Sequence, residues 1–560
     1  MMKFDVFAVA KSLRLLFGPG KGNHTTFTLS PPALLACGAI ALLGAGGAQA
    51  ALVENLTIGN PRALALGNAV TADPPGVDSI HFNPAGLARV DGREGLFKLT
   101  AAYFNFRAEF GSYHPDAQAE IDKWGMGETD PVENSVSETD DIMVKVPFVE
   151  GRTEWPLPVI IVPTGGAAFR PEGKDYTLGT AAFAPMAAGY VRDDEDPGSF
   201  MGKEMALTRI TYFSPTIGFK LNDEWSVGMG VHFSYQGVSA YTDLRVQHLL
   251  LGVINTALDQ LEQGSDCLGG AFTFCGASVS PFEQSVTLEV DVETPLSTTA
   301  AFGALWEPTP WFTWGFVYQT ETTNRMKGSY RMTYSEDWQA VFGTINEELG
   351  GLSSFLGLPT GLAEQSGDAR IDLKTPAHFA TGISVKVLPD WKVNIDAKWT
   401  DWAVWEGLKI EYDEVQEFSS VGSVLAPEYA TPDTLIIPRH YASVWNWAFG
   451  VEHQYNDYIA LRFGYEPRKS SIPDDKQDVL LPIGDADLLT VGIGYEWEKD
   501  SFIDLAIGYY HAHADIPAGS STNANSMDPY NNILYNPYSG LDIETDATAY
   551  LLESSFTWQF

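Results

Sequence analysis

Tyr550-Leu-Leu-Glu-Ser-Ser-Phe-Thr-Trp-Gln-Phe560, the C-terminal stretch of the chain, carries the strongest indication of its fold. The side chains of a β-strand point alternately to its two faces. One face of this stretch is therefore apolar and aromatic, with Tyr550, Leu552, Phe556, Trp558 and Phe560, while the other is polar. A final strand of this kind is typical of transmembrane β-barrels in Gram-negative outer membranes. We expect a multi-pass β-barrel in the cell outer membrane.

The N-terminus has the features of an export leader. Basic residues precede an apolar stretch at residues 33–46, and Ala48-Gln49-Ala50 follows as a small-x-small cleavage site. A transmembrane anchor is the alternative, but this stretch is too short for a bilayer core of roughly 30 Å at about 1.5 Å per residue. We expect residues 1–50 to be a signal peptide, removed after Ala50.

The composition is strongly acidic, with 72 Asp and Glu against 34 Lys and Arg and a net charge of −38. Nucleic-acid binding depends on cations that neutralise phosphates, so no nucleic-acid partner is expected. The acids are expected in solvated loops, where their charge keeps an exported protein soluble.

Cys267 and Cys275 are the cysteines that remain once the leader, with Cys37, is removed. In an oxidising periplasm they are expected to form a local disulfide. A metal-binding pair is the weaker alternative, because neither a Cys-x-x-Cys motif nor a nearby histidine supports it.

Strand-like alternation continues through the rest of the chain, in which 45% of all residues are hydrophobic and 12% aromatic. Such alternation is expected when one face of each strand meets lipid and the other a polar lumen. Reading outward from tight turns, we predict an all-β fold, a transmembrane antiparallel barrel of about fourteen strands within residues 96–560. The predicted strands are 96–111, 155–164, 176–190, 206–221, 225–241, 285–306, 311–333, 370–387, 391–412, 441–455, 458–467, 487–498, 501–513 and 547–560.

Two long loops, at residues 242–284 and 334–369, are expected outside the cell with short helices in them. Both carry apolar residues at the spacing of an amphipathic helix. These residues are Leu250, Val253, Ile254 and Leu258 in the first loop and Trp338, Val341, Phe342, Ile345 and Phe355 in the second. The helices could pack on each other and close the barrel mouth, or form an apolar groove that captures a ligand. We favour the capture groove, because this surface would otherwise be exposed.

Residues 51–95, between the leader and the first strand, are rich in small and turn-forming residues. A simple porin would begin its barrel almost at once. A segment of this length before the first strand suggests a plug, or hatch, inside the lumen.

Motifs along the chain point to one family. Gly67-Asn-Ala-Val-Thr-Ala-Asp73 and Phe82-Asn-Pro-Ala-Gly-Leu-Ala88 precede the first strand, and Trp399-Thr-Asp-Trp402, Leu461-Arg-Phe-Gly-Tyr-Glu466 and Leu489-Thr-Val-Gly-Ile-Gly-Tyr495 follow it. With these motifs and the terminal Phe560, the chain resembles the FadL/TodX family, the outer-membrane transporters of long-chain fatty acids and hydrocarbons. The similarity extends over essentially the whole mature chain.

The resemblance implies a monomeric barrel that takes up a hydrophobic small molecule. The ligand would be captured on the outer loops, pass to an internal pocket and leave sideways into the membrane after the hatch rearranges. The hatch residues implied are Asn83, Pro84, Ala85 and Gly86, in which we expect a strained turn that shifts when ligand arrives. Outer-membrane lipid, lipopolysaccharide and the barrel-assembly machinery are the other expected partners.

The resemblance also implies a kinked third strand that opens the barrel wall. The residues concerned here are Pro185, Ala187, Ala188 and Gly189. Proline cannot donate to a sheet, and small side chains seal a wall poorly. A β-bulge in a closed wall explains the same residues equally well.

Catalysis has little support, since the sequence contains no Gly-x-Ser-x-Gly, His-Glu-x-x-His or phosphate-loop motif. We expect no enzyme and no cofactor. His511 and His513 share a strand face and could ligate a metal, but a pair without metal is the simpler interpretation, so no metal site is predicted. A porin or receptor for polar solutes and a structural or adhesive barrel are the alternative functions. The apolar loop helices argue against the first and the hatch against the second.

The sequence leaves the chemical identity of the ligand open. A fatty acid requires a buried cation for its carboxylate, whereas a hydrocarbon requires none. Arg209, Lys374, Lys398 and Arg439 lie on or near predicted strands and are the candidates.

Overall fold

The computed structural model describes residues 59–123, 129–139, 141–146, 153–155, 159–245, 282–349, 359–425, 427–528 and 536–560. The expected signal peptide and the two cysteines lie outside these residues. So do five residues of the predicted capture groove, Leu250, Val253, Ile254, Leu258 and Phe355. The predictions for all of these residues stay predictions.

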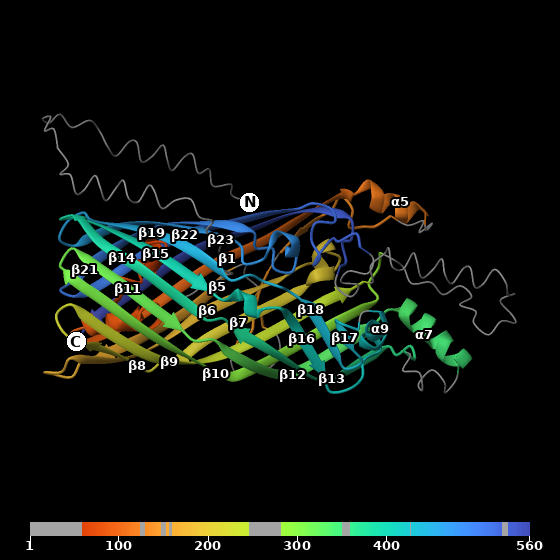
Figure 1. The fold of residues 1–560 in the computed structure, drawn as a ribbon, viewed down its shortest axis with the longest axis horizontal. Coiled ribbons are helices and arrows are strands. Elements are labelled where there is room, and N and C mark those ends of the chain that lie inside the picture. Colours follow the sequence, from red (N-terminus) through yellow and green to blue (C-terminus); the bar gives the residue numbers. More distant parts are fainter. Residues whose placement is uncertain are drawn as a thin grey trace, which may run out of the picture. The chain divides into compact units, whose positions relative to one another are not determined.

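A closed antiparallel β-barrel of fourteen strands forms most of the described chain, which confirms the predicted fold class (Figure 1). Five of these strands are interrupted and consist of two segments each. In chain order the barrel strands are β1 (Arg93–Tyr113), β5 (Ile160–Phe169), β6 (Tyr176–Val191), β7 (Glu204–Phe213) with β8 (Thr216–Lys220), β9 (Trp225–Leu244), β10 (Val286–Thr309), β11 (Phe312–Gln319) with β12 (Thr322–Tyr334), β13 (Glu364–Thr375) with β14 (His378–Leu388), β15 (Trp391–Thr400) with β16 (Gly407–Tyr412), β18 (Thr434–Pro438) with β19 (Val444–Gln454), β20 (Ile459–Arg468), β21 (Asp485–Glu498), β22 (Ser501–Ile516) and β23 (Leu541–Gln559).

The barrel closes where the first strand pairs with the last. β1 and β23 run antiparallel, with Phe97 opposite Phe556. On β23, Leu552 is exposed on the outer face while the neighbouring Glu553 is buried on the inner face. The two-faced pattern predicted for the C-terminal strand is therefore confirmed.

The second predicted strand, at residues 155–164, is placed too early. The observed strand is β5, in which Pro163 lies opposite Leu99 of β1. β5 pairs with β6 only from Gly165 onward. Pro163 therefore lies where the ladder toward β6 is absent, and a proline is tolerated there because no second donor is needed.

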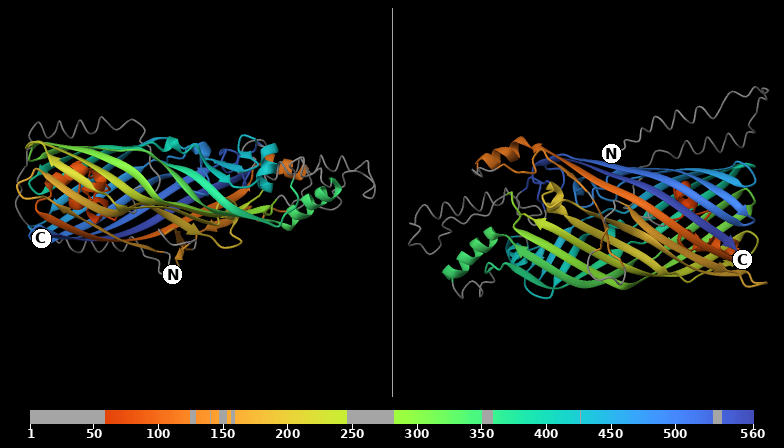
Figure 2. Two further views of the ribbon diagram at one scale, coloured as in Figure 1. Left: turned by 90° about the horizontal axis from the view of Figure 1, so that it is seen from below. Right: turned by 180° about the vertical axis from the view of Figure 1, so that it is seen from behind.

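Three helices lie at the end of the barrel opposite the C-terminus (Figures 1 and 2). They are α5 (Pro115–Lys123), α7 (Glu336–Leu349) and α9 (Glu417–Leu425). α7 is the helix predicted in the second outer loop, and the Ser335 hydroxyl caps it by accepting from the Trp338 backbone N–H at 3.2 Å. Other short elements are β2 (Val136–Glu138), β3 (Ile142–Val144), β4 (Thr153–Trp155), η3 (Pro197–Met201), η4 (Trp402–Val404), β17 (Ala430–Thr431) and η5 (Asp474–Lys476).

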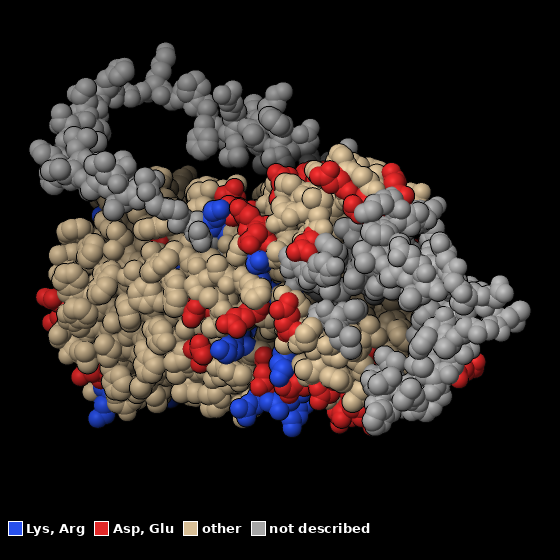
Figure 3. Space-filling view, turned by 45° about the vertical axis from the view of Figure 1, so that its right-hand side comes forward, with Lys and Arg blue, Asp and Glu red and all other residues tan. Residues whose placement is uncertain are grey.

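Charge is unevenly distributed on the face of the molecule shown in Figure 3. Figure 3 shows a broad expanse of uncharged residues on the barrel wall and charged residues gathered toward the end that carries the helices. None of the helices in the described ranges is both long and apolar enough to cross a membrane.

Residues 59–92, called here the N-terminal segment, lie along the inner face of the barrel near the end that holds the C-terminus (Figure 2). Their helical turns are α3 (Pro61–Ala65), η1 (Gly76–Asp78), α4 (Ser79–Phe82) and η2 (Pro84–Arg89).

Glycines on the inner face of the wall make room for this segment. A Cβ atom on Gly464 of β20 would lie 1.9 Å from the Gly67 nitrogen, and one on Gly228 of β9 would lie 2.2 Å from the Pro84 carbonyl carbon. No side chain fits at such distances, because protein interiors are close-packed. Similar approaches occur at Gly303, Gly315, Gly450 and Gly492. The segment is fitted closely to the wall; its action as a movable hatch stays a prediction.

Candidate functional site

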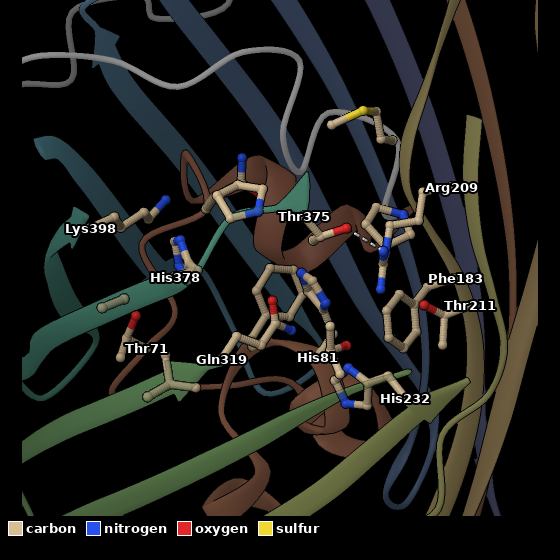
Figure 4. A pocket seen from close by; sticks show the side chains of 18 of the residues that line it. Thr71, His81, Phe183, Arg209, Thr211, His232, Gln319, Thr375, His378 and Lys398 are labelled. Atoms are coloured by element: carbon tan, nitrogen blue, oxygen red, sulfur yellow. Dashed lines mark hydrogen bonds between the residues drawn. The ribbon is translucent and has the colours of Figure 1, made fainter. Parts of the chain in front are cut away.

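An internal cavity of about 60 Å³ lies between the N-terminal segment and the barrel wall (Figure 4). Its lining combines apolar side chains, such as Phe82, Phe183 and Met186, with cationic and imidazole groups. One water molecule needs roughly 10–15 Å³ of such space. The cavity therefore has room for a small polar headgroup but not for a long alkyl chain.

Arg209 of β7 reaches the cavity from the wall and is buried. Its Nη1 donates to the hydroxyls of Thr375 at 2.6 Å and Ser297 at 3.2 Å, and to the Gln236 side-chain oxygen at 3.4 Å. Across the described ranges, no carboxylate forms an ion pair with it. A buried cation without a counter-charge is costly, so an anionic group beside Arg209 would be stabilised.

Lys398 of β15 lies on the opposite side of the cavity from Arg209 in Figure 4. Its ammonium group pairs with Glu466 of β20 at 3.3 Å, so its charge is already balanced. The cavity thus presents one compensated cation and, within its described lining, one cation without a carboxylate.

Three histidines stand around the same cavity: His81 of α4, His232 of β9 and His378 of β14. The His81 ring lies 4.8 Å from the Phe183 ring, measured between centroids. Burial, followed by the neighbouring His232 and His378, lowers the pKa of His81 well below its usual range. His81 is therefore neutral near pH 7, and it adds no charge to compete with Arg209.

The predicted hatch motif forms a capped turn. The Asn83 side-chain oxygen accepts from the Ala85 N–H at 3.2 Å, and Asn83 Nδ2 donates to the carbonyls of Thr71 at 2.8 Å and Ala304 of β10 at 3.2 Å. Pro84, Ala85 and Gly86 follow as buried residues of η2. Asn83 has a φ of −165°, which is extended backbone. The expected strained turn is wrong: the side chain satisfies the helix terminus, and proline at the first position loses no hydrogen bond.

Ionic contacts also join the N-terminal segment to the wall. The Asp73 carboxylate contacts Lys392 of β15 at 2.6 Å, Arg62 at 2.8 Å and Arg89 at 3.4 Å. Burial alone would raise the pKa of Asp73, but these three cations outweigh it and hold that pKa well below its usual range. Glu452 of β19 also pairs with Lys392, at 2.7 Å. Asp73 is thus the centre of a charge network that holds the segment against β15 and β19.

The wall is irregular around the third strand. β5 pairs with β6 only up to Ala182, and the register between β6 and β7 shifts on either side of Pro185. Pro185 itself lines the cavity. Ala187, Ala188 and Gly189 instead pair with β7, and the backbone of β3 packs against Gly189. Of the four residues predicted at a lateral opening, Pro185 is the one that reaches the cavity.

The described part of the predicted capture groove is partly covered. Trp338 is buried against Tyr334 and Phe342, and its Nε1 donates to Glu417 of α9 at 3.2 Å. Val341 and Phe342 are half-buried, and the side chain of Ile345 lies outside the described residues. α7 therefore packs on α9, while its relation to the first outer loop stays a prediction.

Two of the four basic candidates, Arg209 and Lys398, line the cavity. Lys374 is exposed, and Arg439 forms a buried ion pair with Asp478 away from this cavity. His81, His232, His378 and Phe183 also line the cavity and were not predicted at a site from the sequence. No sequence motif joins them, because they come from separate strands and one helix.

Comparisons with known proteins agree with this architecture. A family model described as outer membrane protein transport protein (OMPP1/FadL/TodX) matches residues 40–560. A long-chain fatty acid transport protein of Escherichia coli O6:H1 (strain CFT073) is 23% identical over 35% of this chain; the match spans 41% of that relative, less than two thirds of its length.

Two solved structures share the fold. One is a FadL homologue from Pseudomonas aeruginosa, with a TM-score of 0.62 and 20% identity over 92% of this chain and 100% of its own. The other is the toluene transporter TodX from P. putida, with a TM-score of 0.56 and 13% identity over 90% of this chain and 99% of its own. The protein is therefore an outer-membrane β-barrel of the outer membrane protein transport protein (OMPP1/FadL/TodX) family.

Proposed function

We propose that this protein takes up fatty acids across the outer membrane and holds their carboxylate at Arg209. The observation that carries the proposal is a buried guanidinium at an internal cavity of mixed polar and apolar lining, with no carboxylate partner in the described ranges. Membership of a transport family supports uptake as the activity. The relative named as a long-chain fatty acid transport protein supports the substrate class.

The charge at Arg209 favours a fatty acid over an aromatic hydrocarbon. An aromatic hydrocarbon offers a cation only the face of its uncharged ring, whereas a carboxylate carries a full negative charge and can accept two parallel N–H···O bonds from a guanidinium. Phe82, Phe183 and Met186 would contact the methylenes next to the carboxylate. Each buried methylene contributes roughly 0.8 kcal/mol, so a chain of many methylenes would add strongly to binding.

Entry of the alkyl chain requires motion, because the cavity has room for a headgroup alone. The N-terminal segment is the part proposed to move as a hatch. Polar contacts join it to the wall, among them those of Asn83 and Asp73, and polar contacts of this kind can exchange partners during a two-state change.

We propose that capture begins on the outer loops that include α7 and that release occurs sideways through the wall near Pro185. The half-buried Phe342 supports the first step, since it offers apolar surface at the outer end. The shortened β5–β6 pairing and the register shift at Pro185 support the second, since fewer ladder bonds must break there.

Substitution of Arg209 by Met tests the substrate class. Uptake of labelled oleate and of labelled toluene is measured in cells with matched surface amounts of each variant. A hydrogen bond to a charged group contributes about 1.5–3 kcal/mol, so Arg209→Met should reduce oleate uptake at limiting concentration about 10- to 150-fold. Toluene entry should not change. Lys374→Met, which removes an exposed lysine, serves as the matched control.

Heat-modifiable migration in gels confirms that each variant has folded. Normal oleate uptake by folded Arg209→Met would refute the role of Arg209. Wild-type cells that take up toluene but not oleate would favour a hydrocarbon transporter, and rapid entry of a small sugar would favour a porin.

A further inference from the structure

An outward-facing group of histidines and carboxylates lies on β22 and β23, next to the aromatic pair Tyr509 and Tyr550. On β22, His511, His513 and Asp515 alternate with inward residues and so share the outer face; on β23, Glu544 and Asp546 do the same. We call these five residues the outer-face cluster. The β22–β23 register places His513 opposite Asp546 and Asp515 opposite Glu544.

Three members of the outer-face cluster have the arrangement of metal ligands. One ligand atom each from His513, Asp515 and Glu544 lies within 4.8 Å of the other two. His513 Nε2 is 3.4 Å from an Asp515 carboxylate oxygen, which is close to the separation of two ligands on one small divalent cation. The second imidazole nitrogen, Nδ1, lies 3.1 Å from Asp546. A carboxylate in that position commonly orients a metal-binding histidine.

Asp515 and Glu544 lie directly opposite each other on neighbouring strands. Like charges opposite each other across two strands are destabilising. Elsewhere on the outer face, a basic residue two positions away neutralises such an acid, as Arg370 does for Asp372 at 3.1 Å. Within the described ranges, neither Asp515 nor Glu544 has an ion pair with lysine or arginine. Arg107, the nearby cation on β1, pairs with Glu109 instead. His513, two positions before Asp515, occupies the place that a basic residue has in the Arg370–Asp372 pair.

We infer that His513, Asp515 and Glu544 form a binding site for a divalent cation of the zinc type, with Asp546 as the positioning residue for His513. One nitrogen and two carboxylate ligands suit zinc, whereas magnesium and calcium prefer oxygen ligands alone. The ion would cross-link β22 and β23 at the outer end of the barrel wall. Zinc at His513 would differ from the expectation that His511 and His513 are a pair without metal, and that expectation stays a prediction.

The test is calorimetric titration of the purified full chain in detergent with ZnCl₂, after treatment with EDTA. We expect saturable binding that His513→Asn and Asp515→Asn abolish. Asp546→Asn should weaken the affinity about 10- to 100-fold, as loss of an orienting carboxylate does at other sites. His453→Asn is the matched control, because His453 also lies beside a carboxylate, Asp390 at 3.5 Å, but belongs to no group of three metal-ligating residues in the described part of the chain.

The substituted side chains are on the surface, so folding should persist and heat-modifiable migration checks it. Zinc affinity that is the same in wild type and folded His513→Asn would overturn the inference. Displacement of zinc by an equal concentration of MgCl₂ would also overturn it, since that result would indicate an unselective acidic surface.

Discussion

Replacement of Asp73 by Asn should loosen the N-terminal segment by about 1–2 kcal/mol. The carboxylate has two close cationic contacts, Lys392 at 2.6 Å and Arg62 at 2.8 Å, and a longer one to Arg89 at 3.4 Å. Hydrogen bonds to charged groups contribute about 1.5–3 kcal/mol and neutral ones about 0.5–1.5, so losing the charge costs about 1 kcal/mol or more for each close contact. Part of this loss is recovered, because each of the three cations keeps a second acid within reach.

Hydrogen–deuterium exchange of the purified full chain, followed by mass spectrometry, measures the change. A loss of about 1–2 kcal/mol raises the open population about 5- to 30-fold, so amides of residues 62–65 and 85–89 should exchange faster by that factor. Asp91→Asn is the matched control: Asp91 pairs with Arg170 at 2.7 Å but is 81% exposed, where an ion pair contributes little. Unchanged exchange of the N-terminal segment in Asp73→Asn would refute the reasoning. Faster exchange throughout the barrel strands would indicate general destabilisation and would refute it equally.

Three further predictions concern other parts of the chain. Gly464→Ala places a Cβ atom 1.9 Å from a backbone nitrogen of the N-terminal segment. The resulting overpacking of about 1–3 kcal/mol should speed amide exchange in that segment, while the strand-dominated circular dichroism spectrum persists. Normal exchange in this variant would contradict the close fit. The folded-state pKa of His81 is depressed, so the stability it permits is complete above its unfolded pKa of about 6.5 and declines as the pH falls below that value. Protection of the N-terminal segment should thus decrease between pH 7.5 and 5.5, and less so in His81→Asn; an equal decrease in both would count against His81. Cys267 and Cys275 should be unreactive in a thiol titration of the unfolded, unreduced mature protein, and reaction of both thiols would exclude the disulfide.

The barrel was predictable from the sequence because strand patterning is local. Alternation along Tyr550–Phe560 identifies an outward apolar face without knowledge of any neighbour, and β23 has that face. Pro163 marks where this reasoning failed. Proline disfavours a strand in general, but the consequence depends on whether a partner strand needs its N–H, and β6 does not pair there.

The hatch motif likewise combines a feature that the local sequence predicts with a contact that depends on the tertiary structure. Asn followed by Pro is a local signal for a capped helical turn, and Asn83 and Pro84 form one. The contact from Asn83 to Ala304 is not local, because it joins residues far apart in the chain through the curvature of the wall.

The internal cavity depends entirely on such long-range relations. His81, Arg209, His232, His378 and Lys398 lie on five different elements, and no spacing in the sequence relates them. The alternation of side chains follows from the two-residue period of the extended backbone, so the chain alone specifies which residues face inward. Which inward residues meet at one depth depends on the tilt and stagger of the strands, and these become defined when the sheet closes into a barrel.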